Sequence, residues 1–283
     1  MRFDFPTIMV LLVFVTGLIW ALDAAFFAPR RRLVEPEPDR PGDDPSGSGE
    51  PAILVEPRET PRLVEYARSF FPIFLIVLIL RSFVAEPFRI PSGSMMPTLH
   101  IGDFILVNKF TYGIRLPVLD RKLIELGTPK RGDIIVFRSP ENPATPFIKR
   151  VVGVPGDHIS YYNKVLYING EAADQDFRGE YVGTGSGTKW SGASMRDENL
   201  DGHIHKILIQ PRMPTVEGKT VVPEGNYFVL GDNRDNSRDS RFWGTVPDEL
   251  LIGRAFLIWM NWDWRHRNIW KRIGWERIGD SIQ

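Results

Sequence analysis

Residues 147–170 read FIKRVVGVPGDHISYYNKVLYING, and this stretch decides the fold class of most of the chain. Short runs of β-branched and aromatic residues are separated here by the turn signals Pro155-Gly156 and Asn169-Gly170. Such runs are typical of consecutive β-strands, because branched and aromatic side chains pack well on a pleated surface. Runs of the same kind are found at Asp103–Lys109, Asp133–Arg138, Phe147–Val154, His158–Tyr162, Lys164–Ile168, Lys206–Gln210, Tyr227–Leu230 and Leu251–Met260. We therefore predict a mainly β domain over residues 86–283.

A less regular segment interrupts these strands. Residues 171–201 are rich in Gly and Ser and carry weak hydrophobic patterning, which predicts a loop-rich insertion at about residues 160–222. His203 and His205 follow it, spaced to share one face of a strand. A third ligand at matching spacing is missing, so we expect two surface histidines rather than a metal site.

Composition restricts the possible functions. The chain has 283 residues, 35 Lys and Arg balancing 35 Asp and Glu, and no cysteine. A net charge of zero provides no basic field, so nucleic-acid binding is not expected. The lack of cysteine excludes disulfides, thiolate metal sites, iron–sulfur clusters and a cysteine nucleophile. We expect neither a metal nor a cofactor.

Two apolar runs precede the β domain. Residues 5–22, FPTIMVLLVFVTGLIWAL, carry no charge and are long enough to cross a bilayer as a helix. Residues 69–85 carry one charge, Arg81, close enough to the end of the run to reach the interface. Pro72 would lie in the first turn of that second helix, where proline is tolerated. We predict two transmembrane helices, at 5–22 and 69–85.

Residues 23–68, between the two runs, are rich in Pro, Gly and acidic residues, which predicts a polar loop. Arginines flank this loop on both sides, whereas the N-terminus offers only Arg2 beside Asp4. By the positive-inside rule the loop lies in the cytoplasm, and everything after Glu86 lies on the far side of the membrane. A cleaved signal peptide is the alternative for the first run. Its length and the three arginines that follow it favour a retained anchor.

Three later segments carry residues that chemistry can use. Residues 90–99, IPSGSMMPTL, place Ser94 in a small-residue turn, for which a simple capping turn is the alternative. In the strand FIKRVV, alternation sends Phe147 and Lys149 to one face. Burial of that face would lower the pKa of Lys149 and provide a neutral amine as a base, whereas an exposed edge strand would not. Residues 231–244, GDNRDNSRDSRFWG, suggest a rigid hydrogen-bonded loop or a solvated turn.

Together these segments resemble the sequence boxes of bacterial type I signal peptidases, at residues 91–99, 131–137, 148–156 and 231–244. Their order and spacing, and the two preceding apolar runs, agree with the Gram-negative members of that family. The resemblance implies an antiparallel β-sheet catalytic domain anchored in the inner membrane by two N-terminal helices. It also implies a serine endopeptidase that removes signal peptides from exported preproteins after a small-x-small site.

The resemblance assigns roles to individual residues. It makes Ser94 the nucleophile and Lys149 the general base, with an acyl-enzyme intermediate. Ser237 is expected to hydrogen-bond the Lys149 amine, and Ser92 to stabilise the oxyanion together with the Ser94 backbone N–H. Supporting charge pairs are implied for Arg150, Asp232, Asp239 and Arg241.

The resemblance also implies how the preprotein is recognised. Two shallow apolar pockets for small side chains would be lined by Phe88, Ile90, Met95, Leu99, Ile105, Val136, Phe147 and Ile148. The substrate would bind extended and add a strand to the edges at Ile90 and Phe147.

A cluster of tryptophans and basic residues near the C-terminus predicts contact with membrane lipid, because Trp prefers the headgroup region and cations are drawn to anionic lipid. Its members are Trp259, Trp262, Trp264, Trp270, Trp275, Arg265, Arg267, Lys271, Arg272 and Arg277. A tryptophan core is the alternative.

Two rival functions stay open at this point. A self-cleaving or regulatory Ser/Lys protease of the repressor type would share the chemistry, but the two membrane spans argue against it. An inactive, membrane-anchored β domain that binds exported chains would not require Ser94, Lys149 and Ser237 together. Cleavage of preproteins in trans would separate the peptidase from both rivals.

Overall fold

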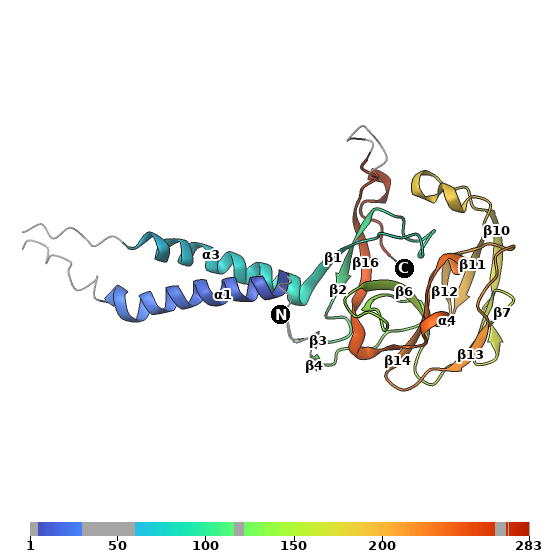
Figure 1. Ribbon diagram of the computed structural model, residues 1–283, viewed down its shortest axis with the longest axis horizontal. Coiled ribbons are helices and arrows are strands. Elements are labelled where there is room, and N and C mark those ends of the chain that lie inside the picture. Colours follow the sequence, from blue (N-terminus) through green and yellow to red (C-terminus); the bar gives the residue numbers. More distant parts are fainter. Residues whose placement is uncertain (1–4, 30–59, 116–121, 264–269, 271, 283) are drawn as a thin grey trace, which may run out of the picture. The chain divides into compact units, whose positions relative to one another are not determined.

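The computed structural model describes residues 5–29, 60–115, 122–263, 270 and 272–282 (Figure 1). The chain divides into two compact units, Met1–Arg81 and Ser82–Gln283. The first unit carries two long apolar helices, and the second is mostly antiparallel β-sheet. The predicted fold class, mainly β with two N-terminal helices, is therefore confirmed.

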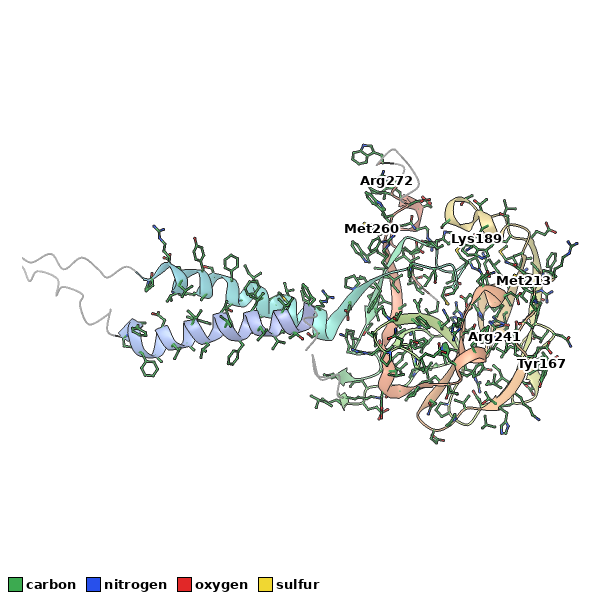
Figure 2. All side chains as sticks on the ribbon, in the orientation of Figure 1. Tyr167, Lys189, Met213, Arg241, Met260 and Arg272 are labelled. Atoms are coloured by element: carbon green, nitrogen blue, oxygen red, sulfur yellow. The ribbon has the colours of Figure 1, made fainter. Side chains whose placement is uncertain are left out.

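Helices α1 (Phe5–Leu22) and α3 (Arg62–Ile79) make up the described part of the first unit. Helix α1 continues into a π-helical turn, Asp23–Phe27. The 21-residue stretches Thr7–Phe27 and Arg62–Ser82 are long and apolar enough to cross a membrane. Apolar side chains project outward along both helices, as expected for segments surrounded by lipid rather than by a protein core (Figure 2). Most of the predicted polar loop, residues 30–59, lies outside the described residues.

The two helices approach each other closely at a glycine. Trp20 of α1 and Phe71 of α3 place their ring centroids 5.5 Å apart, and a Cβ at Gly17 would lie 2.8 Å from the Phe71 ring. The sequence predicted Pro72 in the first turn of the second helix, and this prediction is wrong. Pro72 lies inside α3, because the helix begins at Arg62. The apolar run marks only the part suited to lipid, while the preceding polar residues are themselves good helix formers.

The second unit is built on a seven-stranded sheet with the order β1-β2-β16-β5-β6-β14-β15. Neighbouring strands pair antiparallel throughout. The strands are β1 (Ala85–Arg89), β2 (Asp103–Asn108), β5 (Ile134–Arg138), β6 (Pro146–Gly153), β14 (Asn226–Leu230), β15 (Val246–Pro247) and β16 (Leu251–Asn261). Lys149 on β6 is buried, so β6 is not the exposed edge strand that was the alternative for this residue.

Two smaller sheets occupy the segment that was expected to be rich in loops. They have the orders β13-β7-β8-β9 and β10-β11-β12. Their strands are β7 (His158–Tyr162), β8 (Val165–Ile168), β9 (Glu171–Ala172), β10 (Gln175–Glu180), β11 (Ser194–Leu200), β12 (His203–Ile209) and β13 (Gly218–Val221). Hydrophobic patterning does not detect β11, because the residue that this strand buries most deeply is Glu198.

Short elements complete the unit: β3 (Ile114–Arg115), β4 (Lys122–Ile124), η3 (Gly185–Trp190), η4 (Arg234–Asn236), α4 (Ser240–Trp243), η5 (Asp248–Leu250) and η7 (Trp275–Arg277). One hydrophobic cluster matters most for the site. In it, Met95 and Leu99 pack with Ile105 of β2 and Val136 of β5. This packing holds the segment that contains Ser94 against the seven-stranded sheet.

Candidate active site

Ser94 and Lys149 meet in the structure although 55 positions separate them in the sequence. Ser94 lies in the turns that follow β1, and Lys149 lies near the middle of β6. The Lys149 Nζ is 2.7 Å from the Ser94 Oγ and donates a second hydrogen bond to the Ile148 carbonyl at 2.8 Å. Only 8% of Ser94 and 4% of Lys149 are exposed. The hydroxyl and the amine thus form a hydrogen-bonded pair that is shielded from water.

Burial lowers the pKa of Lys149 from 10.5 to about 8, because the charged ammonium loses hydration. The charges of Asp239 and Asp232 act in the opposite direction, and that of Arg241 lowers the pKa further. A substantial fraction of the amine is therefore neutral near pH 8. A neutral amine at hydrogen-bond distance can accept the proton of the Ser94 hydroxyl.

Asn233 fastens the turn that carries Ser94. Its backbone N–H donates to the Ser94 carbonyl at 3.0 Å, and its side-chain Nδ2 donates to the Gly93 carbonyl, also at 3.0 Å. Asn233 is fully buried. Sequence reasoning placed this residue in a hydrogen-bonded loop but missed its partners, because nothing local connects it with a turn 140 residues away.

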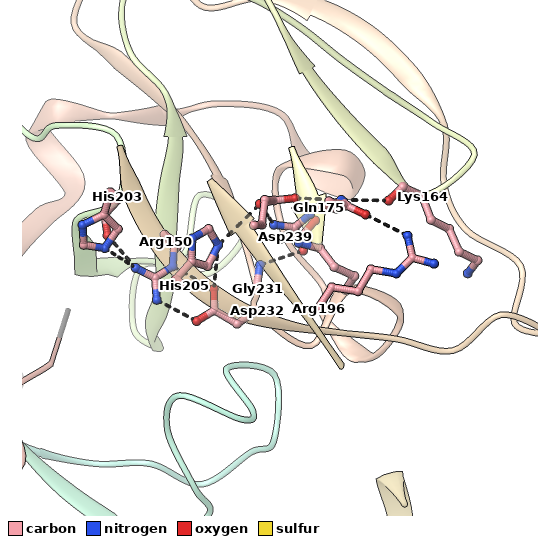
Figure 3. Close-up of polar contacts among 12 residues, drawn as sticks. Arg150, Lys164, Gln175, Arg196, His203, His205, Gly231, Asp232 and Asp239 are labelled. Atoms are coloured by element: carbon pink, nitrogen blue, oxygen red, sulfur yellow. Dashed lines mark hydrogen bonds and ion pairs between the residues drawn. The ribbon is translucent and has the colours of Figure 1, made fainter. Parts of the chain in front are cut away.

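Arg150 and Asp232 form a buried ion pair beneath the site (Figure 3). The Arg150 Nε and Nη2 donate to the two Asp232 carboxylate oxygens, each at 2.9 Å. Arg150 Nη1 also donates to the Gly132 carbonyl at 2.7 Å, and Thr98 Oγ1 donates to Asp232 at 2.5 Å. Burial alone would raise the pKa of Asp232, but the Arg150 charge and these hydrogen bonds hold it below its usual value. The pair therefore links β6, the Ser94 segment and the 231–244 loop.

Asp239 and Arg241 form a second brace within the 231–244 loop. One Asp239 carboxylate oxygen accepts a hydrogen bond from the Gly231 backbone N–H at 3.0 Å. The Arg241 Nε and Nη2 donate to the carboxylate at 2.8 Å each. Asp239 is fully buried, so this loop is rigid and hydrogen-bonded rather than a solvated turn. All four residues predicted to support the site thus lie in buried charge pairs beside it.

The structure treats the two orienting serines differently. Ser92 is exposed, and its Oγ lies 3.5 Å from the Ser94 Oγ, at the limit of a hydrogen bond. Ser237 is buried beside Gly231 and the Ser94 carbonyl, but its Oγ has no hydrogen-bond partner in the part of the chain that the structure describes. The predicted bond from Ser237 to Lys149 is therefore not formed. Within the described residues, Lys149 bonds Ser94 and the Ile148 carbonyl instead.

Seven of the eight residues predicted to line the pockets belong to one cluster. Phe147 is the exception, since it packs with Phe137 and Trp243 in a second cluster. The seven are Ile90, Met95, Leu99, Ile105 and Val136, which are buried, with Phe88 and Ile148 partly buried beside them. The substrate-binding role of all eight stays a prediction.

The sequence predicted that His203 and His205 both lie on the surface, and for His205 this prediction is wrong. His205 is 6% exposed, and its Nε2 lies 3.4 Å from the Glu198 carboxylate and 4.0 Å from that of Asp232. Glu198 is itself paired with Arg234. His203 is half-buried and 3.3 Å from Arg150, and burial together with the Arg150 charge lowers its pKa. Within the described residues, no group of three His, Asp or Glu is placed to hold a metal ion.

Four members of the predicted lipid-contacting cluster, Trp264, Arg265, Arg267 and Lys271, lie outside the described residues. Trp270 and Trp275 are 71% and 60% exposed, which fits a surface rather than a core. Trp259 is 40% exposed and stacks edge-on against Phe104. Arg277, which was predicted to contact lipid, instead bonds the buried Asp103 carboxylate at 2.6 and 2.9 Å.

Comparisons with known proteins agree with this geometry. A family model described as signal peptidase, peptidase S26, matches residues 63–262. The chain is 47% identical to signal peptidase I of Pseudomonas fluorescens over 278 residues, which cover 93% of this chain and 94% of that protein. Identity to signal peptidase I of Pseudomonas aeruginosa is 47%, with the same coverage. For signal peptidase I of Haemophilus influenzae it is 33%, over 94% of this chain and 88% of that protein.

The family match includes Ser94, Lys149 and the whole 231–244 loop. Members of this family are membrane-bound serine peptidases that cleave signal peptides from preproteins. With a matching family model over most of the chain and near-full-length relatives, the chain belongs to the signal peptidase family, peptidase S26.

Proposed function

We propose that this chain removes N-terminal signal peptides from exported preproteins by a Ser94–Lys149 dyad, cutting after a small-x-small site. The observation that carries the proposal is the buried 2.7 Å contact between the Lys149 Nζ and the Ser94 Oγ. A pKa of about 8 for Lys149 makes this lysine a competent base without help from a histidine.

In the first half of the reaction, neutral Lys149 takes the proton from the Ser94 hydroxyl as the Oγ attacks the carbonyl carbon of the scissile bond. The carbonyl oxygen becomes an oxyanion, which accepts hydrogen bonds from the Ser94 backbone N–H and the Ser92 hydroxyl. One such donor is worth about 3–4 kcal/mol of transition-state stabilisation. The Lys149 ammonium then gives its proton to the departing amine, which leaves the signal peptide as an ester on Ser94.

In the second half, Lys149 is neutral again and takes a proton from water. The resulting hydroxide attacks the ester carbonyl, and the Ser94 Oγ leaves with the proton from the Lys149 ammonium. The signal peptide is released with a free carboxylate, and Ser94 and Lys149 return to their starting states. Burial of both groups supports this cycle, because a water-filled site would restore the ordinary lysine pKa.

The specificity for small side chains would come from the apolar cluster beside Ser94. Bulky residues such as Ile90, Met95 and Val136 leave little depth, so alanine fits and a larger side chain is rejected. The extended substrate would pair with β6, because β14 pairs with β6 only from Arg150 to Gly153. Pairing at Ile90 would use its neighbours, since the Ile90 backbone is already bonded to Asp103 and Gly102.

The membrane arrangement follows from the helices and the arginines. We place the stretches Thr7–Phe27 and Arg62–Ser82 across the inner membrane, the polar loop between them in the cytoplasm and the β unit on the periplasmic side. Exposed Trp270 and Trp275 would lie against the lipid surface. The two apolar stretches of 21 residues support a two-span anchor.

The test uses the full chain in detergent and a secretory preprotein, with the products identified by mass spectrometry. Wild type should cut after a small-x-small site, and Ser94→Ala and Lys149→Ala should each abolish the cut. Ser160→Ala and Lys206→Ala, which change the same residue types elsewhere in the β unit, serve as controls and should keep full activity.

Cleavage by Lys149→Ala at the wild-type rate would mean that another base acts and would overturn the dyad. A folded wild-type protein that binds the preprotein without cutting it would favour the inactive binding domain. Cutting only of its own chain would favour the regulatory protease.

A further inference from the structure

Gly93, the residue before the proposed nucleophile, faces an aromatic ring. A Cβ built on Gly93 would overlap Trp190: its three nearest atoms are ring carbons of that residue, all within 2.7 Å. Trp190 is 3% exposed and ends η3, in the segment expected to be rich in loops. Gly93 has no left-handed φ that would itself require glycine. The lack of a side chain at Gly93 is therefore explained by the Trp190 ring rather than by the backbone.

The same segment also contacts the chain on the other side of Ser94. A Cβ at Gly187, in η3, would lie 2.9 Å from the Met96 Cε and 2.6 Å from the Tyr181 hydroxyl. Met96 is fully buried in a cluster with Trp190, Ala193 and Leu208. Segment η3 therefore packs against residues 93 and 96, one before and one after the proposed nucleophile.

Two different kinds of contact thus hold the turn that contains Ser94. Asn233 bonds the carbonyl groups of Gly93 and Ser94, whereas Trp190 fills the space that a side chain at Gly93 would take. Among the described residues no acceptor bonds the buried Trp190 Nε1, so packing and not its N–H holds the ring. The hydrogen bonds fix the two carbonyl groups, and the ring fills the space next to Gly93 into which the turn could otherwise shift.

We propose that Trp190 is a positioning residue for Ser94, through which the insertion controls the rate of the peptidase reaction. This inference rests on the proposed function of Ser94. The Ser94 Oγ must stay at 2.7 Å from Lys149 for proton transfer, and a displacement of about 1 Å at a reacting atom can cost about 100-fold in rate. The charges that act on the Lys149 pKa are those of Asp239, Asp232 and Arg241, and Trp190 carries no charge, so its loss should lower kcat with little movement of the pH midpoint of the rate.

The experiment measures kcat, KM and the pH profile of the full chain in detergent with a preprotein substrate. Trp190→Ala should lower kcat by about 10- to 100-fold, with KM and the pH midpoint little changed. Trp190→Phe keeps a shorter ring and should retain an intermediate kcat. Phe177→Ala is the matched control: this aromatic residue lies in the same insertion, on β10, is 65% exposed, and should leave kcat unchanged.

A pair of variants tests the contact itself. Gly93→Ala should lose activity by about 100-fold, because the new methyl group overlaps the ring. Adding Trp190→Ala to Gly93→Ala should then cause no loss beyond that of Trp190→Ala alone, since the overlap is removed. A purely structural role of Trp190 predicts the opposite, namely that the two changes add.

The outcomes separate this inference from the proposed function, because Ser94→Ala is measured in the same assay. Cutting by Ser94→Ala would overturn the proposed function and the inference with it. An inactive Ser94→Ala beside a Trp190→Ala with wild-type kcat would overturn only the inference. So would a double variant in which the two single losses multiply. If Trp190→Ala fails to fold, Trp190→Phe decides the question, alone and combined with Gly93→Ala.

Discussion

Lys149 and Arg150 are neighbours on β6, and both are buried, but the two faces of the strand provide different surroundings. On one face, Lys149 donates to the neutral oxygens of Ser94 and Ile148. On the other, Arg150 forms two hydrogen bonds with the Asp232 carboxylate. A buried ammonium with no direct ion pair loses its proton readily, whereas a guanidinium paired with a carboxylate stays charged. Lys149 is therefore suited to proton transfer, and Arg150 to holding the segments around it in place.

The largest effect is expected when Lys149 is replaced by a residue that, like Arg150, keeps its positive charge. Lys149→Arg keeps a positive charge but removes the titration, because a guanidinium does not give up its proton in proteins. We expect a fall in kcat of about 1,000-fold or more, with the fold retained. Preprotein cleavage and circular dichroism measure the two effects. Lys164→Arg is the matched control and should keep the wild-type rate; an active Lys149→Arg would contradict the proposed base.

The second prediction breaks the supporting pair. Arg150→Met leaves the buried Asp232 carboxylate without its partner and should lower the free energy of unfolding by about 3–5 kcal/mol. Arg150→Met combined with Asp232→Leu should recover part of that loss, because no uncompensated charge is left behind. Urea denaturation of the full chain in detergent measures both.

Arg238→Met, which breaks an ion pair on the surface with Glu141, is the control for this comparison and should change the unfolding midpoint little. Equal effects at Arg150 and Arg238 would show that burial does not distinguish the two pairs.

The smallest effect concerns the pH at which Lys149 acts. A general base works when deprotonated, so kcat should rise with pH through a midpoint near the Lys149 pKa of about 8. Burial depresses that pKa, and Asp239 is the strongest of the opposing charges. Asp239→Asn should therefore move the midpoint to lower pH. Glu141→Gln, at an exposed acid, should leave it in place; an upward shift in Asp239→Asn would contradict the assignment.

Local alternation predicted the sheet and put Phe147 and Lys149 on one face, but it left open whether that face is buried, and only the structure shows that Lys149 is buried. Once Phe147 is assigned to the inner face, Lys149 must share it. The charge cluster of Glu198, Arg234 and His205 could not be predicted in this way. Strand β11 buries the Glu198 carboxylate at a position where hydrophobic patterning requires an apolar residue. Arg234, which compensates for the Glu198 charge, comes from another part of the chain.

The contacts that hold the turn with Ser94 could not be predicted from the sequence either. Asn233 and Trp190 stand in segments that share no periodic pattern with the turn they hold, and only the folded chain brings them to Gly93. The bond from Ser237 to Lys149 was expected from the resemblance alone, and the structure does not form it. Local signals thus predicted most strands of the seven-stranded sheet, and the contacts between distant segments required the structure.

The long separation between Gly93 and Asn233 has a consequence for the newly made protein. Closing a loop of 140 residues is entropically costly, so the contact forms only after many others have brought the segments together. During synthesis, the ribosome releases Ser94 and Lys149 well before Asn233. The turn with Ser94, the proposed nucleophile, therefore lacks its bonds to Asn233 until most of the β unit has been made, and we expect peptidase activity to begin only then.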